Sequence, residues 1–463
     1  MKTDCGQGEL EFQGLDSRRV CADFSGGAVT SDAGALLLRE VDFRTGLIDK
    51  FAACFTDSRD ARYVKHDLGV LLRQRVMAIA LGHEDLCDHD ELRDDPLMSL
   101  AAGRAKMDRG AGKSTLQRAE GFLADSRYHK LAFDPGAADR FLIEYFLDSH
   151  TAPPAVIDID LDASDAPTHG DQELNFFNAY YGHYCYLPLY ITCGDHILCV
   201  RLLPSNQDPG KAWEAEAPRI VEQIRKRWPQ ATIRLRGDCG FMRDPLMKWC
   251  EENNVFYVLG MPKNKRLVKM IGKEMEEAKR LHGERREASR VFGDFAYQTQ
   301  KSWSAARRVV AKAEHLDKGA NPRFVVTNLP VDQFPAKELY EKIYCARGAM
   351  ENRIKEHQAD LFGDRLSGTQ AATNQLRLYL STVAYTLIAT LRRCALPGTA
   401  LERAQSGTIR RKLLKIGARI TVSARRVFLS MSGSYPHKEL FALVLSNLNQ
   451  LALVPARARA GPL

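Results

Sequence analysis

Three aspartates alternate with apolar residues in the run AVIDIDLD, which begins at residue 155. In an extended strand, successive side chains point to opposite faces, so Asp158, Asp160 and Asp162 share one face. Like charges at this spacing repel one another unless water or a cation compensates them. The run is therefore either a solvated strand end or the start of an acidic site.

The aspartate spacing also matches the opening of a calcium-binding loop. Such a loop needs glycine at its sixth position and glutamate at its twelfth. Here those positions hold Ala163 and His169, so the calcium interpretation fails.

Composition limits the classes of protein. A chain of 463 residues with 45% hydrophobic and 27% charged residues is typical of a globular protein with two to four structural units. The net charge of +8 is compatible with nucleic acid as a partner. The 11 cysteines form no Cys-x-x-Cys pair, which argues against a structural zinc site and a disulfide scaffold. We expect a reducing compartment, with no signal peptide and no membrane span.

The pattern along the chain predicts five regions. Residues 1–150 are expected to be an α-helical N-terminal region, and Pro153-Pro154 marks a change to short strand-like runs. Strands and helices then indicate an α/β unit with a mixed sheet, in two parts: residues 151–262 and residues 336–395. A β-rich insertion, residues 263–335, separates these parts, and residues 396–463 form a basic C-terminal region.

A second acid lies in Arg-Gly-Asp238-Cys-Gly, at the end of a predicted strand. Flanking glycines suggest a backbone that closely approaches another group and a carboxylate exposed at a sheet edge. A simple Gly-Asp turn is an equally good interpretation of this motif alone.

The third element is a predicted helix that contains YCARGAMENRIKEHQ. At about 100° per residue, one face carries an aromatic residue, two cations, a carboxylate and an amide: Tyr344, Arg347, Lys355, Glu351 and Gln358. Glu351 and Lys355 are spaced to form a surface ion pair, which is the plainer alternative.

These motifs, in this order on an α/β unit, resemble the DDE transposases of bacterial insertion sequences. The resemblance is closest to the insertion-sequence family numbered thirteen-eighty and covers nearly the whole chain. It is carried by DIDLDASDAPTHGDQE, YYGHYCYLPL, RLRGDCGF and YCARGAMENRIKEHQADLF, with SDAGALLLRE and LRQRVMAIALGHEDLCDHDELRDDP nearer the start. It implies a ribonuclease-H-like catalytic core with a β-rich insertion before the final acid.

The resemblance assigns the catalytic, metal-binding acids to Asp162, Asp238 and Glu351. Asp162 is preferred to Asp160 because the family pattern places Ser or Thr two residues after the first acid, and Ser164 fits. We expect Asp162, not Asp160, to converge with Asp238 and Glu351.

The cations of the helix face differ from the family pattern. Tyr344 and Arg347 match the residues that precede the final acid in the family signature, and we expect them to contact DNA. The signature also has lysine seven residues after the acid, where this chain has Gln358. Lys355, one turn earlier on the same face, is a possible substitute.

Three carboxylates suit Mg²⁺ or Mn²⁺, which prefer oxygen ligands, and we expect two ions. The implied activity is DNA strand cleavage and strand transfer, with water or a 3′-hydroxyl as nucleophile. Arg347 and Lys355 would hold phosphates. The expected partner is double-stranded DNA, both transposon ends and target, bound by a homodimer on paired ends. The expected location is the bacterial cytoplasm, at the nucleoid.

Aromatic residues outside these motifs have two possible roles. Trp303, flanked by Lys301 and Arg307, could stack on an extruded base, although structural packing is the more common role. The run from Phe176 to Tyr186 is expected to pack in the core and the sheet.

Two other functions remain as alternatives. One is a ribonuclease-H-like nuclease without strand transfer, and the other is a catalytically silent DNA-binding repressor. The presence of all three acids disfavours the repressor. A fragment of residues 1–150 is expected to bind the terminal repeats of the element in preference to random DNA.

Overall fold

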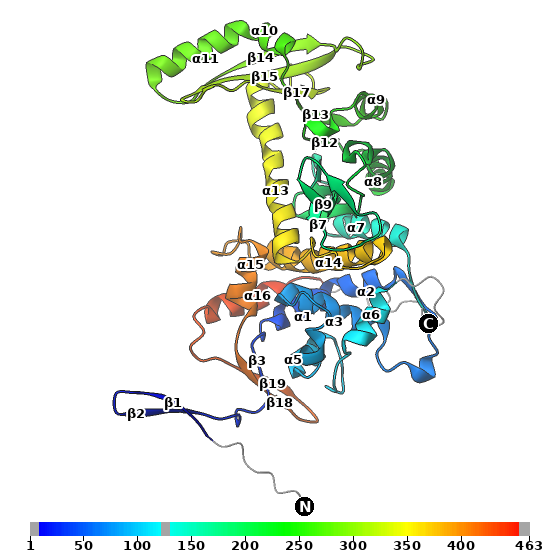
Figure 1. Cartoon of the computed structure of the whole chain (residues 1–463), viewed down its shortest axis with the longest axis vertical. Helices are drawn as coiled ribbons and strands as arrows, with labels where there is room; N and C mark the ends of the chain where they lie inside the picture. The colour runs from blue at the N-terminus through cyan, green and yellow to red at the C-terminus, as the bar shows by residue number, and fades with distance from the viewer. Residues whose placement is uncertain (1–8, 122–129, 453–463) are drawn as a thin grey trace, which may run out of the picture. The chain divides into compact units, whose positions relative to one another are not determined.

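The computed structural model describes residues 9–121 and 130–452 (Figure 1). The chain divides into two compact units. Met1–Ala132 and Val383–Leu463 make up the first unit, and Phe133–Thr382 makes up the second. These units cut across the five regions expected from the sequence, because the C-terminal segments belong to the same compact unit as the N-terminal helices.

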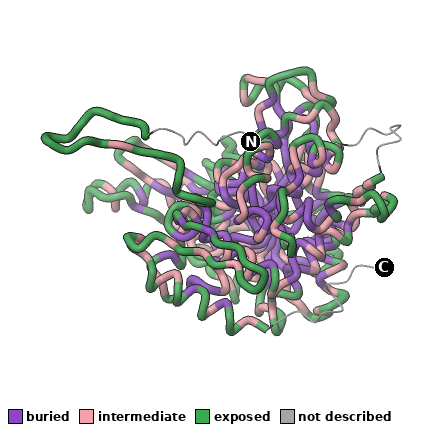
Figure 2. Tube along the Cα trace, turned by 90° about the horizontal axis from the view of Figure 1, so that it is seen from below, coloured by how far each residue is buried: buried purple, intermediate pink, exposed green. Residues whose placement is uncertain are grey.

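The first unit combines short helices with three small sheets. Its elements are β1 (Leu10–Leu15), β2 (Arg18–Ala22), β3 (Val29–Thr30), α1 (Ala35–Thr45), α2 (Leu47–Ala52), β4 (Phe55–Asp57), η1 (Ala61–Tyr63), α3 (Leu68–Leu81), α4 (His89–Leu92), α5 (Pro96–Ala101), α6 (Lys113–Glu120), α15 (Ser406–Ile409), η7 (Arg410–Leu414), β18 (Ala418–Val422), β19 (Val427–Met431) and α16 (Lys438–Asn449). Strand β5 (Leu131–Phe133) lies at the unit boundary, and α14 (Ala371–Ala395) contributes to both units. The hairpin β1–β2 is exposed along almost all of its length (Figure 2).

In the first unit, backbone hydrogen bonds join a segment from the N-terminal part of the chain to a segment from its C-terminal part. Strand β18 pairs with both β3 and β19. The amides of Ala33 and Gly34 donate to the carbonyls of Ile416 and Leu414. Gly34 permits this approach, because a β-carbon there would overlap the backbone of Leu413. A fragment of residues 1–150 therefore lacks part of its own compact unit.

The second unit is built around a mixed sheet in the order β11-β10-β6-β12-β13-β17-β15-β14. Strands β6, β12 and β13 are parallel, while β10, β11 and β17 run antiparallel to their neighbours. Its elements are α7 (Pro135–Asp148), β6 (Ile157–Ala163), β7 (Ala166–Pro167), β8 (Phe176–Asn178), β9 (His183–Tyr186), β10 (Leu189–Cys193), β11 (His196–Arg201), η2 (Pro209–Lys211), α8 (Trp213–Arg227), β12 (Ile233–Gly237), η3 (Cys239–Phe241), α9 (Asp244–Glu252), β13 (Phe256–Met261), α10 (Lys265–Met270), α11 (Gly272–Arg285), β14 (Ser289–Tyr297), β15 (Arg307–Leu316), β16 (Gly319–Ala320), β17 (Arg323–Thr327), α12 (Ala336–Glu338), η4 (Leu339–Tyr344), η5 (Cys345–Arg347), α13 (Gly348–Lys355) and η6 (Glu356–Asp360).

Both faces of this sheet are covered. Figure 1 shows α8 and α9 on one side of β12 and β13, and α13 on the other. Side chains alternate accordingly along β13: Tyr257 and Leu259 join the core that contains Leu246, whereas Val258 packs in the cluster of Tyr340. A sheet covered on both faces accounts for the apolar character of its central strands.

The residues expected to form a β-rich insertion extend the same sheet. Strand β17 pairs with β13, and β15 and β14 follow it outward. Helix α11 lies along β14 and β15 (Figure 1). The insertion therefore lengthens the central sheet and also carries two helices.

The run HYCYLPLYIT is divided between two sheets in the structure. Strand β9 joins a separate three-stranded sheet, β7-β9-β8, while β10 belongs to the central sheet. Pro188 lies between them, and proline has no amide hydrogen for a ladder hydrogen bond. Among the described residues, no helix combines the length and the apolar character that a membrane crossing requires.

Candidate active site

Two of the three aspartates on β6 are paired within the central sheet. The parallel register places Asp158 beside Arg234 and Asp160 beside Arg236. Each arginine donates two hydrogen bonds to its aspartate, at 2.6 and 2.8 Å. Both carboxylates are thus neutralised by the neighbouring strand, a pairing that the sequence analysis did not foresee.

Asp162 lies two residues after Asp160 on β6 and has a different environment. Its side chain is 18% exposed, and its Oδ2 accepts a hydrogen bond from Nη1 of Arg347 at 3.0 Å. Burial raises the pKa of the Asp162 carboxyl, Arg347 opposes this shift, and the charge of Asp238 reinforces it. Asp162 is thus within electrostatic reach of Asp238, whereas Asp160 is paired with Arg236.

Asp238 follows directly after β12, whose last residue, Gly237, is in register with Leu161 of β6. Its Oδ1 accepts a hydrogen bond from the amide of Gly240 at 2.9 Å, and so caps the short helix η3. The sequence allowed two interpretations of this motif, a Gly-Asp turn or an acid exposed at a sheet edge. Asp238 shows both features.

Glu351 reaches the same place from α13. Its side chain is 54% exposed, and its Oε1 accepts a hydrogen bond from Nη2 of Arg347 at 3.2 Å. Arg347, at 11% exposure, thus bridges Asp162 and Glu351 with one guanidinium group. Asp162, Asp238, Arg347 and Glu351 are called the acid cluster below.

The helical segment that carries Arg347 and Glu351 is irregular. Its turns change from π-helix in η4 to a 3-10 turn in η5, to α-helix in α13, and back to π-helix in η6. Such departures from α-helix often occur at functional sites. The Tyr344 hydroxyl packs over β13, where a β-carbon at Gly260 would lie only 2.5 Å from it, so glycine is required there. Burial raises the pKa of Tyr344.

Gln358 holds the end of β6 in place. Ser164 Oγ donates a hydrogen bond to Gln358 Oε1 at 3.1 Å, and Gln358 Nε2 donates to the carbonyl of Asp165 at 2.9 Å. Lys355 is exposed and makes no ion pair with any described residue. The Gln358 amide therefore links η6 to the residues that follow β6, whereas the Lys355 ammonium group lies toward solvent.

Trp303 is buried, so the expectation that it stacks on an extruded base is corrected. Its side chain is 6% exposed and belongs to the core of the second unit. Its ring makes an edge contact with Tyr297, and the guanidinium of Arg307 lies over it at 5.7 Å. Packing, the other role considered for it, accounts for these contacts.

The aromatic run from Phe176 to Tyr186 is more exposed than expected. Four of its rings are exposed instead of packed: Phe176 (37%), Phe177 (56%), Tyr180 (89%) and Tyr184 (54%). Only Tyr186 is fully buried. The sequence did carry a signal, because Asn178 and Gly182 are turn-forming residues on either side of the two central tyrosines.

The acid cluster suits a hard divalent cation in its donor chemistry, since it offers three carboxylates and no sulfur or imidazole. Among residues 9–121 and 130–452, however, no group of three or more His, Cys, Asp or Glu side chains is already arranged to hold a metal. Arg347 explains this arrangement, because its guanidinium supplies the positive charge between Asp162 and Glu351.

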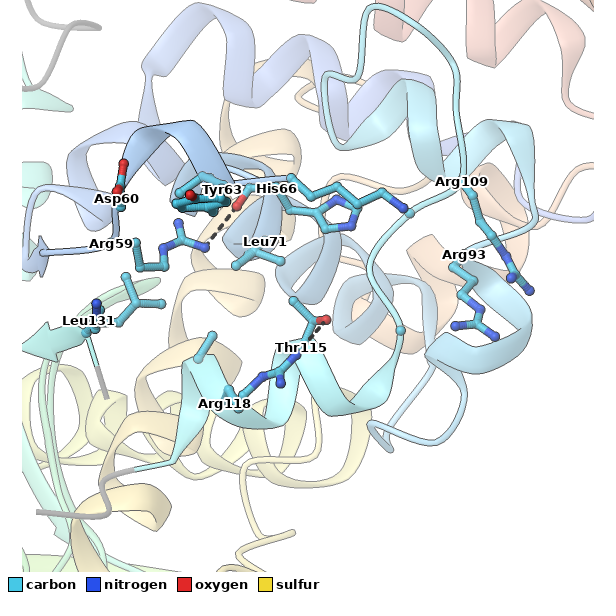
Figure 3. Close-up of a pocket in the computed structure, with 16 residues that line it drawn as sticks. Arg59, Asp60, Tyr63, His66, Leu71, Arg93, Arg109, Thr115, Arg118 and Leu131 are labelled. Carbon is cyan, nitrogen blue, oxygen red and sulfur yellow. Dashed lines mark hydrogen bonds between the residues drawn. The ribbon is translucent and has the colours of Figure 1, made fainter. Parts of the chain in front are cut away.

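The first unit contains a cationic cavity of about 620 Å³. Six lining residues are cations and one is an acid, Asp60; the cations are Arg59, Lys65, Arg93, Arg109, Arg118 and Lys130. Figure 3 shows Arg118 and Thr115 on one side of the cavity, with Tyr63 and His66 on the other. Arg118 is exposed on α6 and forms no ion pair with a described residue. Arg59, Arg93 and Arg109 are paired with Asp57, Asp90 and Asp94, so the positive charge of the cavity that is left for an anion lies mainly on Arg118, Lys65 and Lys130.

Comparison with known proteins identifies the family. Residues 12–453 match the family model described as transposase DDE domain group 1. The chain belongs to this family. It is a DDE transposase, an enzyme that cleaves DNA strands and transfers them. No curated protein matches the chain.

Membership agrees with the geometry in three respects. DDE transposases generally use divalent metal ions, and the acid cluster offers oxygen ligands. The family implies DNA as a partner, and the first unit has a cationic cavity. The large mixed sheet with parallel strands is consistent with the catalytic core of this DDE transposase.

Proposed function

We propose that Asp162, Asp238 and Glu351 are the catalytic acids of this DDE transposase and that they bind Mg²⁺ or Mn²⁺. The observation that carries the proposal is the position of Arg347, which donates to Asp162 and Glu351 while the charge of Asp238 acts on Asp162. Carboxylates that gather around one guanidinium and have perturbed pKa values are typical of functional sites.

A pair of metal ions would activate the attacking oxygen and stabilise the leaving oxygen. The residues of the chain bind and orient the DNA strand. Arg347 and the exposed Lys355 supply positive charge for phosphates beside the acids. Tyr344 acts by packing over Gly260 and so supports the helix that carries Arg347.

The finer assignments are part of the same proposal. The sheet order β11-β10-β6-β12-β13 supports a ribonuclease-H-like core, because the first acid lies near the end of the central strand β6 and the second directly follows its parallel neighbour β12. We assign the chain to an insertion sequence, of the family numbered thirteen-eighty. A homodimer on paired ends in the bacterial cytoplasm is the state in which we expect it to act.

We place the binding of the element's ends on the first unit. Helix α6 presents an exposed polar face beside the cationic cavity, formed by Lys113, Ser114, Gln117 and Arg118. Its opposite face is anchored by Leu116 and by Glu120, which is paired with Arg75 at 2.8 Å. An anchored helix with a free polar face can enter a DNA groove while nearby cations contact phosphates.

Strand transfer with a pre-cut donor end tests the proposal. The full chain, with Mg²⁺ and a duplex that ends in the terminal repeat, should join that end to a target plasmid. Nicking without joining would indicate a nuclease of the same fold. Binding without either reaction would indicate a repressor. Sequencing the DNA that flanks the gene should reveal the inverted repeats needed for the donor.

A further inference from the structure

The hairpin between β8 and β9 displays a cluster of aromatic side chains that the acid cluster does not use. We call Phe177, Tyr180, Tyr181 and Tyr184 the aromatic patch. Three of these residues are more than half exposed, at 56, 89 and 54% for Phe177, Tyr180 and Tyr184. Contiguous exposed aromatic residues on a globular protein usually mark a binding surface.

The loop of the hairpin is held in one conformation. The Asn178 Oδ1 accepts hydrogen bonds from the amides of Tyr180 and Tyr181, and its Nδ2 donates to the carbonyl of Ser205. Gly182, with φ of +76°, donates its amide to the carbonyl of Asn178. The rings are thus presented by an ordered loop, which lowers the entropic cost of binding.

The rings contact one another edge to face. The planes of Tyr180 and Tyr181 meet at 88° and those of Phe177 and Tyr184 at 71°, with centroids 4.9 and 5.5 Å apart. In such a pair the edge of one ring points at one face of the other, which leaves the remaining faces uncovered by this contact, and Tyr180 is 89% exposed. A flat aromatic ligand can stack on an open face.

The hairpin that carries the patch is linked to the end of β6, where Asp162 lies. Strand β9 pairs with β7, which follows β6 after a short turn, and His183 Nε2 lies 3.0 Å from Oδ2 of Asp165 in that turn. The charges of both Asp165 and Asp162 act on the Tyr181 hydroxyl and, together with burial, raise the pKa of Tyr181. Of the patch, Tyr181 is therefore within electrostatic reach of Asp162.

We propose that the aromatic patch stacks on unpaired bases of the DNA end whose phosphate lies at the acid cluster. This inference rests on the proposed function. Inside a duplex both faces of a paired base are covered by its neighbours, so several rings can stack on successive bases only where these are released from pairing. Aromatic stacking accepts any base, which suits a site that must process a frayed or distorted end. We prefer DNA to a second copy of this chain because the hairpin of the patch contacts the turn after β6, and Tyr181 is within electrostatic reach of Asp162, one of the proposed catalytic acids.

Two duplexes of equal length and charge test the inference. One is fully paired, and the other has mismatched base pairs at one end, with a fluorescent adenine analogue among the unpaired bases. Binding by the full chain is measured in EDTA, so that no cleavage occurs. The wild-type chain should prefer the mismatched end and quench the analogue.

The variant Tyr180→Ala/Tyr184→Ala should lose about tenfold or more in affinity for the mismatched end and leave the fully paired duplex unaffected. Tyr180→Phe/Tyr184→Phe keeps the rings and should retain both preference and quenching. Val331→Ala, which shortens another apolar side chain with 60% exposure in the second unit, should behave as wild type. Unchanged thermal unfolding of the variants checks that they fold.

Three results would overturn the inference. The first is full preference and quenching in the alanine variant. The second is an equal loss of affinity for both duplexes, which would make the patch a general DNA contact. The third is loss of self-association in sedimentation, which would make it an interface between copies. A wild-type chain that binds neither duplex would instead refute the proposed function, and the stacking inference with it.

Discussion

The hydroxyl of Ser164 donates a hydrogen bond to the side-chain oxygen of Gln358 at 3.1 Å, and so ties the end of β6 to η6. These residues are far apart in the sequence, and they hold the two elements that carry Asp162 and Glu351. We therefore propose a positioning role for Gln358 in this DDE transposase.

Gln358→Ala should lower the rate of DNA cleavage about 10- to 100-fold, as loss of supporting contacts around metal ligands commonly does. The bound substrate should be misaligned but not released, so kcat should fall while DNA affinity stays constant. Single-turnover cleavage and a separate binding titration measure the two effects. Asn352→Ala, which removes an exposed amide from the same helix, is the matched control. An equal fall in affinity would contradict a positioning role.

The neutral variants Asp162→Asn, Asp238→Asn and Glu351→Gln should each abolish cleavage in Mg²⁺ and leave binding of the ends largely intact. Metal ligation, and not folding, is the role proposed for these acids. Asp158→Asn, on the same face of β6 but paired with Arg234, should retain activity and serves as the control. Cleavage near the wild-type rate by any of the three variants would remove that residue from the site.

Asp160→Ala should destabilise the chain by about 3 kcal/mol, because it removes the two hydrogen bonds that buried Arg236 donates to Asp160 and leaves Arg236 only the Ile343 carbonyl and the longer contact with Asp158. Arg236 is only 6% exposed, so water cannot easily replace the carboxylate. The double variant Asp160→Ala/Arg236→Met should recover most of the loss. Unfolding in urea measures the free energies, and a single variant as stable as wild type would refute the pairing.

His357 should make the chain less stable in acid. Burial lowers the pKa of this imidazole to about 3, from an ordinary value of 6.5. Above about pH 6.5 the folded and unfolded states are both neutral at this residue, so its contribution is complete. Between pH 6.5 and about 3, His357 is protonated in the unfolded state but stays neutral in the folded state. The free energy of unfolding therefore falls by up to about 1.4 kcal/mol for each pH unit below 6.5.

His357→Gln should remove this slope, which chemical unfolding at about pH 7 and about pH 5 measures. His169→Gln changes an exposed histidine and should leave the slope as in wild type. Parallel pH profiles for His357→Gln and wild type would show that the buried imidazole is not responsible.

Arg118→Gln in the full chain should weaken binding of the terminal repeats and reduce the slope of log K against log salt by about 1, as expected for one lost phosphate contact. The full chain is required, because the first unit includes residues from both ends of the sequence. Lys226→Gln, a change at an exposed and ion-paired lysine of the second unit, is the control. An unchanged slope would exclude the cationic cavity from the interface.

Local patterns in the sequence determined much of the site. Alternation along the strand put three aspartates on one face of that strand, and helical periodicity put Arg347 and Glu351 on one face of a helix. These are properties of neighbouring residues, so they follow from backbone geometry alone. The resemblance then selected Asp162, Asp238 and Glu351.

Only the tertiary structure decided which aspartate is paired within the sheet. Arg234 and Arg236 neutralise Asp158 and Asp160 because β12 lies beside β6 in parallel register, and register between distant strands depends on packing of the whole sheet. Burial of Trp303 and exposure of Tyr180 were decided in the same way. Apolar content indicates that a ring can be buried, but the neighbouring elements determine whether it is.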